Sequence, residues 1–198
     1  MGRERELVKE GDCIDGGLWE RNVCSVNVNN LIVKRQNKIT EIEVTLEEEK
    51  IDILLLQETK LSDEVDGNET FIEGYVEVRQ VRVGRGGGGV SIYLKNGIGI
   101  VSSKGFSNGW MEVLTVQTMD TMYINIYKSP GIEVEKLKEG LEFIYKEIEG
   151  KDVDLVIAGD INLPRLGRWS PIELAEARTR IVNSRGDGER DGATRRKE

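Results

Sequence analysis

Two stretches of the sequence have the pattern of strands buried on both faces, and each of them ends in an acidic residue. Residues 51–60 (IDILLLQETK) hold an almost unbroken apolar run that stops at a Gln-Glu-Thr segment containing Glu58, which is typical of a central strand in a layered α/β protein. Residues 154–158 (DLVIA) form a second such run, followed directly by Gly-Asp-Ile-Asn with its acid at Asp160. Because a rigid strand end can hold a catalytic group while loops shape the pocket around it, we expect Glu58 and Asp160 to be the two halves of one site.

The composition narrows the chemistry that such a site can use. The 198 residues, enough for one domain with a sizeable core, include no histidine, which removes the commonest general base and every His-based triad. Any catalysis must therefore use carboxylates, together with a hard metal ion such as Mg²⁺ (or Mn²⁺) that prefers oxygen ligands. The net charge of −8 counts modestly against tight binding to nucleic acid, since phosphate contacts need Lys and Arg.

The sequence also predicts where the protein resides and how its cysteines behave. No apolar run approaches the roughly 18 residues of a membrane span, and the start (MGRERELVKE) lacks an apolar signal core. We therefore predict an intracellular protein without membrane contact. Cys13 and Cys24 have no metal-binding spacing, and we expect Cys24 to be a reduced thiol buried in a strand.

Patterning divides the chain into three parts. Residues 1–20 are charged and lack periodicity, which indicates a loose leader. Residues 21–164 carry the periodic segments and form the expected domain. Residues 165–198 hold nine basic and six acidic residues, and from residue 183 onward this tail has too few apolar side chains to bury a core, so we expect it to be disordered.

Within the domain, residues 21–28 predict a strand, and two segments have helical periodicity. Residues 34–50 place Ile39, Ile42 and Leu46 on one stripe, and residues 133–149 show the clearest 3.6-residue repeat of the chain. The first helix begins with basic residues, which would face either a phosphate or simply solvent.

From residue 71 onward the pattern is that of antiparallel strands. One hairpin is expected around Asn96 and Gly97, and another around residues 119–121. A glycine run at residues 84–89 satisfies G-x-G-x-x-G, but it leads into a strand (VSIYL) rather than a helix. We therefore reject a dinucleotide site and expect a tight turn or close backbone approach.

The order of the motifs is more specific than any one of them. NVNNL at 27–31, QET at 57–59, the glycine run into VSIYL, NIYKSP at 125–130 and GDIN at 159–162 together resemble the endonuclease/exonuclease/phosphatase superfamily. They look most like the apurinic-endonuclease-type endonuclease domain of non-LTR (LINE-like) retrotransposons. The family's later acids and its Ser-Asp-His motif have no counterpart here, so the resemblance implies a C-terminally truncated domain.

This resemblance implies a fold and a reaction. The fold would be a partial two-sheet α/β sandwich with the site at one edge, its first sheet largely complete and its second sheet mostly missing. The uncovered face of the first sheet would then invite self-association or a partner. The reaction would be Mg²⁺-dependent hydrolysis of phosphodiesters, with DNA as the ancestral substrate.

The resemblance also assigns roles to residues of this sequence. Glu58 would be the principal metal ligand, with Asn27 and Asn29 completing the metal site. Asp160 would orient or deprotonate the attacking water. Asn162 would hold the phosphate or that water, and Tyr127 would donate a hydrogen bond to the phosphate or the leaving group.

Three functions remain open on this basis. The first is a retroelement-type endonuclease that is weak or inactive because the later acids and the histidine are absent. The second is a small-molecule or lipid phosphoesterase of the same superfamily that uses Glu58 and Asp160. The third is a noncatalytic domain that binds protein or nucleic acid.

Overall fold

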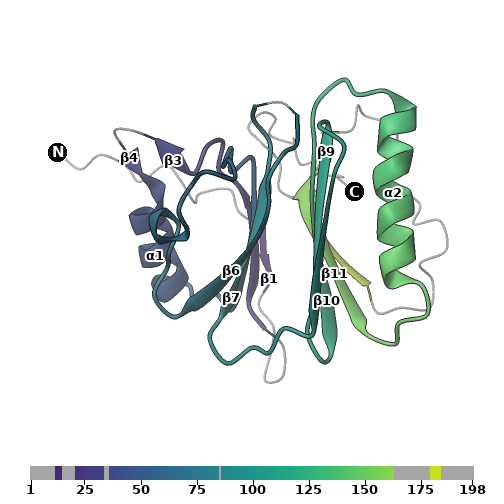
Figure 1. Ribbon diagram of the computed structural model, residues 1–198. Helices are drawn as coiled ribbons and strands as arrows, with labels where there is room; N and C mark the ends of the chain where they lie inside the picture. Colours follow the sequence, from purple (N-terminus) through teal and green to yellow (C-terminus); the bar gives the residue numbers. More distant parts are fainter. Residues whose placement is uncertain (1–11, 15–20, 34–35, 85, 163–178, 184–198) are drawn as a thin grey trace, which may run out of the picture.

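Two β-sheets packed face to face form the centre of the computed structural model (Figure 1), which describes residues 12–14, 21–33, 36–84, 86–162 and 179–183. The first sheet has the strand order β1-β2-β5-β7-β6. Its strands are β1 (Asp12–Ile14), β2 (Val23–Asn27), β5 (Ile53–Gln57), β7 (Val90–Lys95) and β6 (Tyr75–Gln80). β2 and β5 pair in parallel, and the other neighbours pair antiparallel.

The second sheet has the order β12-β11-β10-β9-β8. Its strands are β12 (Thr179–Asn183), β11 (Asp154–Asp160), β10 (Thr121–Lys128), β9 (Met111–Gln117) and β8 (Ser102–Ser107). β11 runs parallel to both of its neighbours, whereas β8, β9 and β10 form an antiparallel meander. Two short strands, β3 (Ile32–Val33) and β4 (Gln36–Asn37), pair separately, and η1 (Gly67–Glu69) is a 3₁₀ turn.

A helix covers the outer face of each sheet (Figure 1). α1 (Lys38–Glu48) packs the predicted stripe of Ile39, Ile42 and Leu46 into a core with the outward-facing side chains of the first sheet. α2 (Val134–Ile148) covers the second sheet, where Ile144 joins a core with Ile124. None of the helices in the described part of the chain is long and apolar enough to cross a membrane.

The facing sides of the two sheets bury each other. Ile53, Leu55 and Ile92 of the first sheet pack in one core with Leu114 and Tyr123 of the second, and each of the five is at most 2% exposed. The predicted two-sheet α/β sandwich is therefore confirmed. The expectation that the second sheet is mostly missing, and that the inner face of the first is uncovered, is wrong, because residues 102–160 supply four strands of the second sheet.

One of the two predicted hairpins is wrong. β7 lies in the first sheet and β8 in the second, so Asn96 and Gly97 turn the chain toward the other sheet instead of joining two paired strands. A turn sequence shows that the chain reverses, but not which strand it pairs with next. The hairpin around residues 119–121 is confirmed, with Met122 opposite Gln117.

The first helix begins later than expected. α1 starts at Lys38, because Gln36 and Asn37 belong to β4; residues 34 and 35 lie outside the described residues. The Lys38 ammonium donates hydrogen bonds to the carbonyl oxygens of Val28 and Asn29. This lysine therefore supports the loop after β2 rather than facing a phosphate. The predicted second helix is confirmed as α2.

Two segments expected to lie outside the domain contribute edge strands. β1 comes from the expected leader and β12 from the expected tail; the rest of residues 1–20 and 165–198 lies outside the described residues. β1 pairs with β2 so that Cys13 stands opposite Cys24. Cys24 is disulfide-bonded, and the chain's other cysteine is Cys13. The expectation of a reduced thiol is therefore wrong, because the strand pairing was not visible in the sequence.

Candidate active site

The predicted site residues follow strand ends that meet at one edge of the sandwich. β2 and β5 are parallel and end together, with Asn27 opposite Gln57 just before Glu58. β10 and β11 are also parallel and end together, with Tyr127 opposite Asp160. Each sheet thus delivers two strand ends to the site, which is why residues far apart in the sequence meet there.

Two hydrogen bonds join the sheets at this edge. The Tyr127 hydroxyl donates to Glu58 Oε1 at 2.7 Å. The Asn27 amide nitrogen Nδ2 donates to Asp160 Oδ2 at 2.8 Å. The structure therefore brings the two predicted halves of the site together, and each acid of one sheet has a neutral partner from the other.

The remaining two predicted residues lie beside these pairs. The backbone N–H of Asn29 donates to Asn27 Oδ1 at 3.0 Å. The backbone N–H of Asn162 donates to Asp160 Oδ1 at 3.2 Å, and its side chain donates to the carbonyl oxygen of Lys128 at 2.9 Å. All six predicted residues thus form one cluster connected by hydrogen bonds or by adjacent backbone.

The backbone at this edge adopts conformations that L side chains seldom occupy. Six non-glycine residues in the described part of the chain have positive φ, and five of them lie here: Asn29 (41°), Asn30 (84°), Glu58 (53°), Lys60 (54°) and Asn162 (41°). Such conformations cost roughly 1–3 kcal/mol each and persist only where the surrounding structure holds them. The strain therefore marks the same residues that the motifs single out.

The glycine run holds this strained backbone in place through close contact. The backbone N–H of Lys60 donates to the carbonyl oxygen of Gly88 at 2.7 Å, and that of Thr59 donates to Gly89 at 3.2 Å. Gly89 has φ of +84°, and a Cβ there would lie 2.7 Å from the Thr59 hydroxyl. The expectation of a close backbone approach is confirmed, and it explains why glycine is needed beside the Glu58 loop.

Burial and neighbouring charge tune the acid and the phenol of the site. Burial raises the pKa of Asp160 and the Glu58 charge adds to that rise, whereas hydrogen bonds from Asn27 and Asn162 oppose it. Burial also raises the pKa of Tyr127, and its hydrogen bond to Glu58 raises it further. Tyr127 therefore remains a protonated hydrogen-bond donor at ordinary pH.

Several residues of the site were not anticipated from the sequence. The Lys60 ammonium lies 3.8 Å from Glu58 Oε2 and donates to Asn29 Oδ1. Its position in the same QETK segment was the available signal. The Arg82 guanidinium lies over the Tyr127 ring, 5.4 Å from its centroid, and pairs with Glu112. Nothing in the sequence links Arg82 to Glu112, because they lie 30 residues apart. Arg82 is in the loop after β6, and Glu112 is in β9 of the other sheet.

The Arg82–Glu112 pair is deeply buried behind the site. Arg82 Nε and Nη2 each donate to Glu112 at 2.8 Å, and Nη2 also donates to the Ser129 hydroxyl at 2.9 Å. The side chains of Arg82 and Glu112 are 4% and 0% exposed. A guanidinium is thus fixed beneath the phenol by a two-pronged ion pair, which is the strongest geometry for such a pair.

A buried amide network fixes the spacing of the sheets just below the site. Gln57 Nε2 donates to Asn125 Oδ1 at 2.6 Å and to the Ser25 hydroxyl at 3.1 Å. The Asn125 amide nitrogen donates to the carbonyl oxygens of Leu56 and Ser91. Gln57, Asn125 and both serines are fully buried. The network therefore joins the two sheets between β5 and β10, next to the strand ends that carry the site.

The oxygen atoms at this edge fit a hard divalent cation that keeps several waters. Glu58 and Asp160 offer carboxylates, and Asn27 and Asn29 offer amide oxygens. Mg²⁺ commonly binds through one or two carboxylates and retains water in its other positions. Within the described residues, no group of three or more His, Cys, Asp or Glu side chains could hold a metal ion.

Two packed sheets with acids, amides and a phenol at a shared edge define an α/β sandwich with a polar cluster at that edge. The chain belongs to the endonuclease/exonuclease/phosphatase family, whose model matches residues 24–189. Enzymes of this family generally depend on a divalent metal ion, and membership suggests a phosphodiester hydrolase. No curated protein matches this sequence.

Solved structures share the fold at low sequence identity. A humanised zebrafish (D. rerio) TDP2 has a TM-score of 0.55 and 16% identity, over 72% of this chain and 66% of its own. The Neisseria 3′ phosphatase NExo has a TM-score of 0.55 and 21% identity, over 72% and 58%. An AP endonuclease from Archaeoglobus fulgidus has a TM-score of 0.52 and 20% identity, over 71% and 57%. The match thus spans less than two thirds of each of these proteins.

Proposed function

We propose that this protein is a divalent-metal-dependent phosphodiester hydrolase that acts on DNA. The observation that carries the proposal is the pair of contacts across the sheets, Tyr127 to Glu58 and Asn27 to Asp160, which assembles acids, amide and phenol at one edge. Two similar structures support a DNA substrate: NExo is described as bound to a product DNA hairpin, and D. rerio TDP2 as complexed with a single-strand DNA product.

In this proposal Glu58, with the amide oxygens of Asn27 and Asn29, holds the metal ion, Mg²⁺ or Mn²⁺. The ion supplies positive charge that stabilises the negative charge developing on the phosphate. Lys60 lies beside this group and adds a further positive charge close to Glu58.

Asp160 positions the attacking water and takes its proton. Its pKa is raised by burial, and a carboxylate with a raised pKa is a stronger base than an exposed one. Asn162 is held by Lys128 and Asp160 with its amide at the same edge, where it orients the water or the phosphate.

Tyr127 donates a hydrogen bond to the phosphate or the leaving group. Its raised pKa keeps the proton on the phenol, so that it stabilises negative charge as a neutral donor. In the structure the Tyr127 hydroxyl donates its hydrogen bond to Glu58. A bound phosphate would accept that hydrogen bond in place of Glu58.

The motifs NVNNL and NIYKSP support a retroelement-type endonuclease within the family. The rate should be low, because the chain has no histidine. A missing positioned acid or base costs about 10²- to 10⁴-fold, and residues of one catalytic site do not compensate for one another.

The experiment is a nicking assay on supercoiled plasmid with Mg²⁺ or Mn²⁺ and with EDTA as the metal-free arm. Glu58→Gln and Asp160→Asn should each lower the metal-dependent rate by about 100-fold or more. Glu49→Gln, an exposed acid just after α1, is the matched control and should nick like the unaltered protein.

The other outcomes decide against the proposal. Nicking that survives both site variants would assign it to a contaminant. Release of phosphate from p-nitrophenyl phosphate without any nicking would favour a small-molecule phosphoesterase. A folded protein with neither activity would favour a noncatalytic binding domain.

A further inference from the structure

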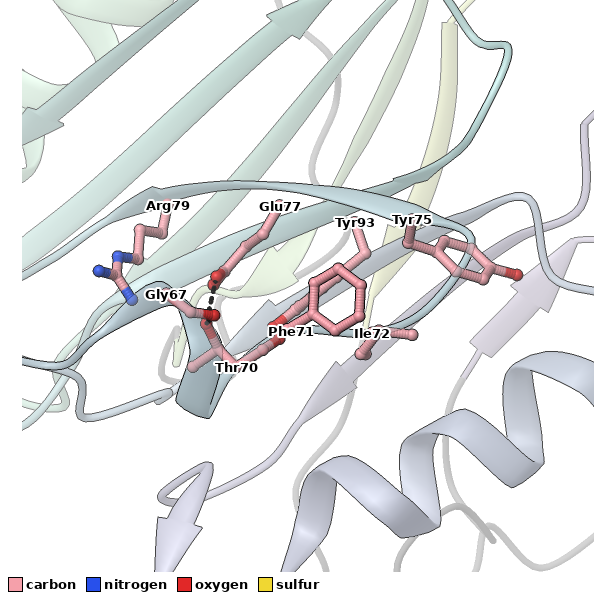
Figure 2. Close-up of a pocket in the computed structure, with 8 residues that line it drawn as sticks. All are labelled: Gly67, Thr70, Phe71, Ile72, Tyr75, Glu77, Arg79 and Tyr93. Atoms are coloured by element: carbon pink, nitrogen blue, oxygen red, sulfur yellow. Dashed lines mark hydrogen bonds between the residues drawn. The ribbon is translucent and has the colours of Figure 1, made fainter.

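A cavity lies on the outer face of the first sheet, away from the residues of the candidate site. It has a volume of about 300 Å³, is partly open to solvent, and is lined by residues of β6, β7 and the loop that contains η1 (Figure 2). Its lining combines aromatic rings with one acid and one arginine. Tyr75, Glu77 and Arg79 alternate along β6 and therefore share one face of the strand.

Arg79 lines this cavity and carries one donor without a partner. Its Nη2 donates to the carbonyl oxygen of Val65 at 2.8 Å. Its Nη1 is buried without a hydrogen-bond partner, and no other buried side-chain nitrogen or oxygen in the described part of the chain lacks one. Burying such a donor unpaired is costly, so the guanidinium would gain by turning Nη1 toward a ligand acceptor in the cavity.

Glu77 provides a fixed acceptor beside that donor. Its two carboxylate oxygens accept hydrogen bonds from the Thr70 hydroxyl at 2.6 Å and from the Ser91 hydroxyl at 2.8 Å. Each oxygen keeps a second lone pair. Figure 2 shows Arg79 and Glu77 at the same end of the cavity, so a ligand there meets a donor and an acceptor together.

Aromatic rings form the rest of the wall. Phe71 is 60% exposed, although it lies against the cavity, whereas Tyr93 is buried and its hydroxyl donates to the carbonyl oxygen of Thr70. An exposed phenyl face beside a cavity suits a flat ring, since bases stack on aromatic side chains without regard to sequence.

These features select one kind of ligand. The carboxylate of Glu77 disfavours a bare anion, so the acceptor for Arg79 should belong to a neutral group. Guanine is a flat ring that carries acceptors at O6 and N7, the usual partners of arginine. It also carries N–H donors on its pairing edge, which a carboxylate can accept.

The cavity lies on the same sheet as the Glu58 strand, two strands away from it. The loop that lines the cavity follows directly after Lys60. Arg79 precedes Gln80, which lies opposite Val90 of β7, and Val90 in turn lies opposite Gln57 of β5. The Arg79 end of the cavity is therefore two strand spacings from the Glu58 strand, about 10 Å across the sheet.

We propose that this cavity binds a nucleobase, with guanine preferred, stacked on Phe71 and read by Arg79 and Glu77. It rests on the proposed function, in which the base belongs to a single-stranded part of the DNA next to the cleaved phosphate. A free guanine nucleotide has the same chemistry, and the test separates the two sources.

The test is isothermal titration calorimetry in EDTA, so that no metal-dependent step contributes. The probes are GMP, AMP, CMP and TMP, followed by the oligonucleotides dTTGTT and dTTTTT. GMP should bind about 10-fold or more tightly than CMP or TMP. Tighter binding of dTTGTT than of GMP assigns the cavity to a DNA strand, and equal binding assigns it to the free nucleotide.

Variants locate the binding. Phe71→Ala should weaken GMP binding about 10-fold or more, and it should fold normally because the ring is largely exposed. Glu77→Gln and Arg79→Lys should each reduce the preference for GMP over CMP. Tyr145→Ala, an aromatic residue of α2 that is 61% exposed on the other sheet, is the matched control.

Two results would overturn the inference: no binding of GMP, or binding that Phe71→Ala and Arg79→Lys leave unchanged. If the unaltered protein binds GMP but does not nick DNA, the proposed function alone is refuted. Retained nicking without GMP binding would refute the nucleobase cavity alone.

Discussion

Replacing Glu112 with Gln tests whether the ion pair behind Tyr127 is as buried as the structure shows. Glu112 accepts hydrogen bonds from Arg82 Nε and Nη2, from the Gly89 backbone and from the Ser107 hydroxyl. A glutamine retains one acceptor oxygen and turns an NH₂ group toward the guanidinium. Arg82, with a side chain 4% exposed, would then carry an uncompensated charge in the interior.

The expected loss is large for a single substitution. Removing one partner of a buried ion pair costs about 3–5 kcal/mol. For a chain of this size each kcal/mol shifts the melting temperature by about 2–4 °C, so the melting temperature should fall by about 6–20 °C. Urea denaturation followed by circular dichroism measures the free energy of unfolding directly.

Two further variants make the test sharp. Glu139→Gln removes an exposed carboxylate paired with Lys136 and should change the free energy of unfolding by less than about 1 kcal/mol. The double variant Arg82→Met with Glu112→Leu removes both buried charges and should recover much of the loss. If Glu112→Gln costs no more than Glu139→Gln, Arg82 reaches water and the argument from burial is refuted.

Three smaller predictions concern the rest of the fold. Gly159→Ala should destabilise by about 1–3 kcal/mol, because a Cβ would lie 1.9 Å from a carbonyl oxygen of β10, whereas Gly99→Ala has open space and should not; urea denaturation compares them. The Arg21 hydrogen bond lowers the pKa of Asp120 to about 2 from its usual 3.8. The resulting stability is present above about pH 4 and lost as the pH falls to about 2, so the difference between Asp120→Asn and the unaltered protein, at most about 1 kcal/mol for an exposed pair, should shrink over that window. Dithiothreitol should lower the free energy of unfolding by about 2–4 kcal/mol by reducing the Cys24 disulfide, and a Cys24→Ser protein should not respond; an equal response would refute a stabilising disulfide.

The sequence determined the local elements and the acids at their ends. Apolar runs predicted β5 and β11, and helical periodicity predicted α2 nearly to its ends. Strand ends in Glu58 and Asp160 predicted a shared site, and the structure brings the two ends together. These features are local because side-chain periodicity and turn residues act over a few positions.

Tertiary structure alone decided which strands share a sheet and which polar groups pair. A strand's periodicity shows that it is buried, but not against which partner, so the crossing between β7 and β8 was read as a hairpin and the second sheet as missing. Arg82 with Glu112, Tyr127 with Glu58, and the cysteine pairing depend on contacts between distant segments. Such pairings arise when packing of the two sheets removes water and leaves each buried charge or donor to find its partner within the folded chain.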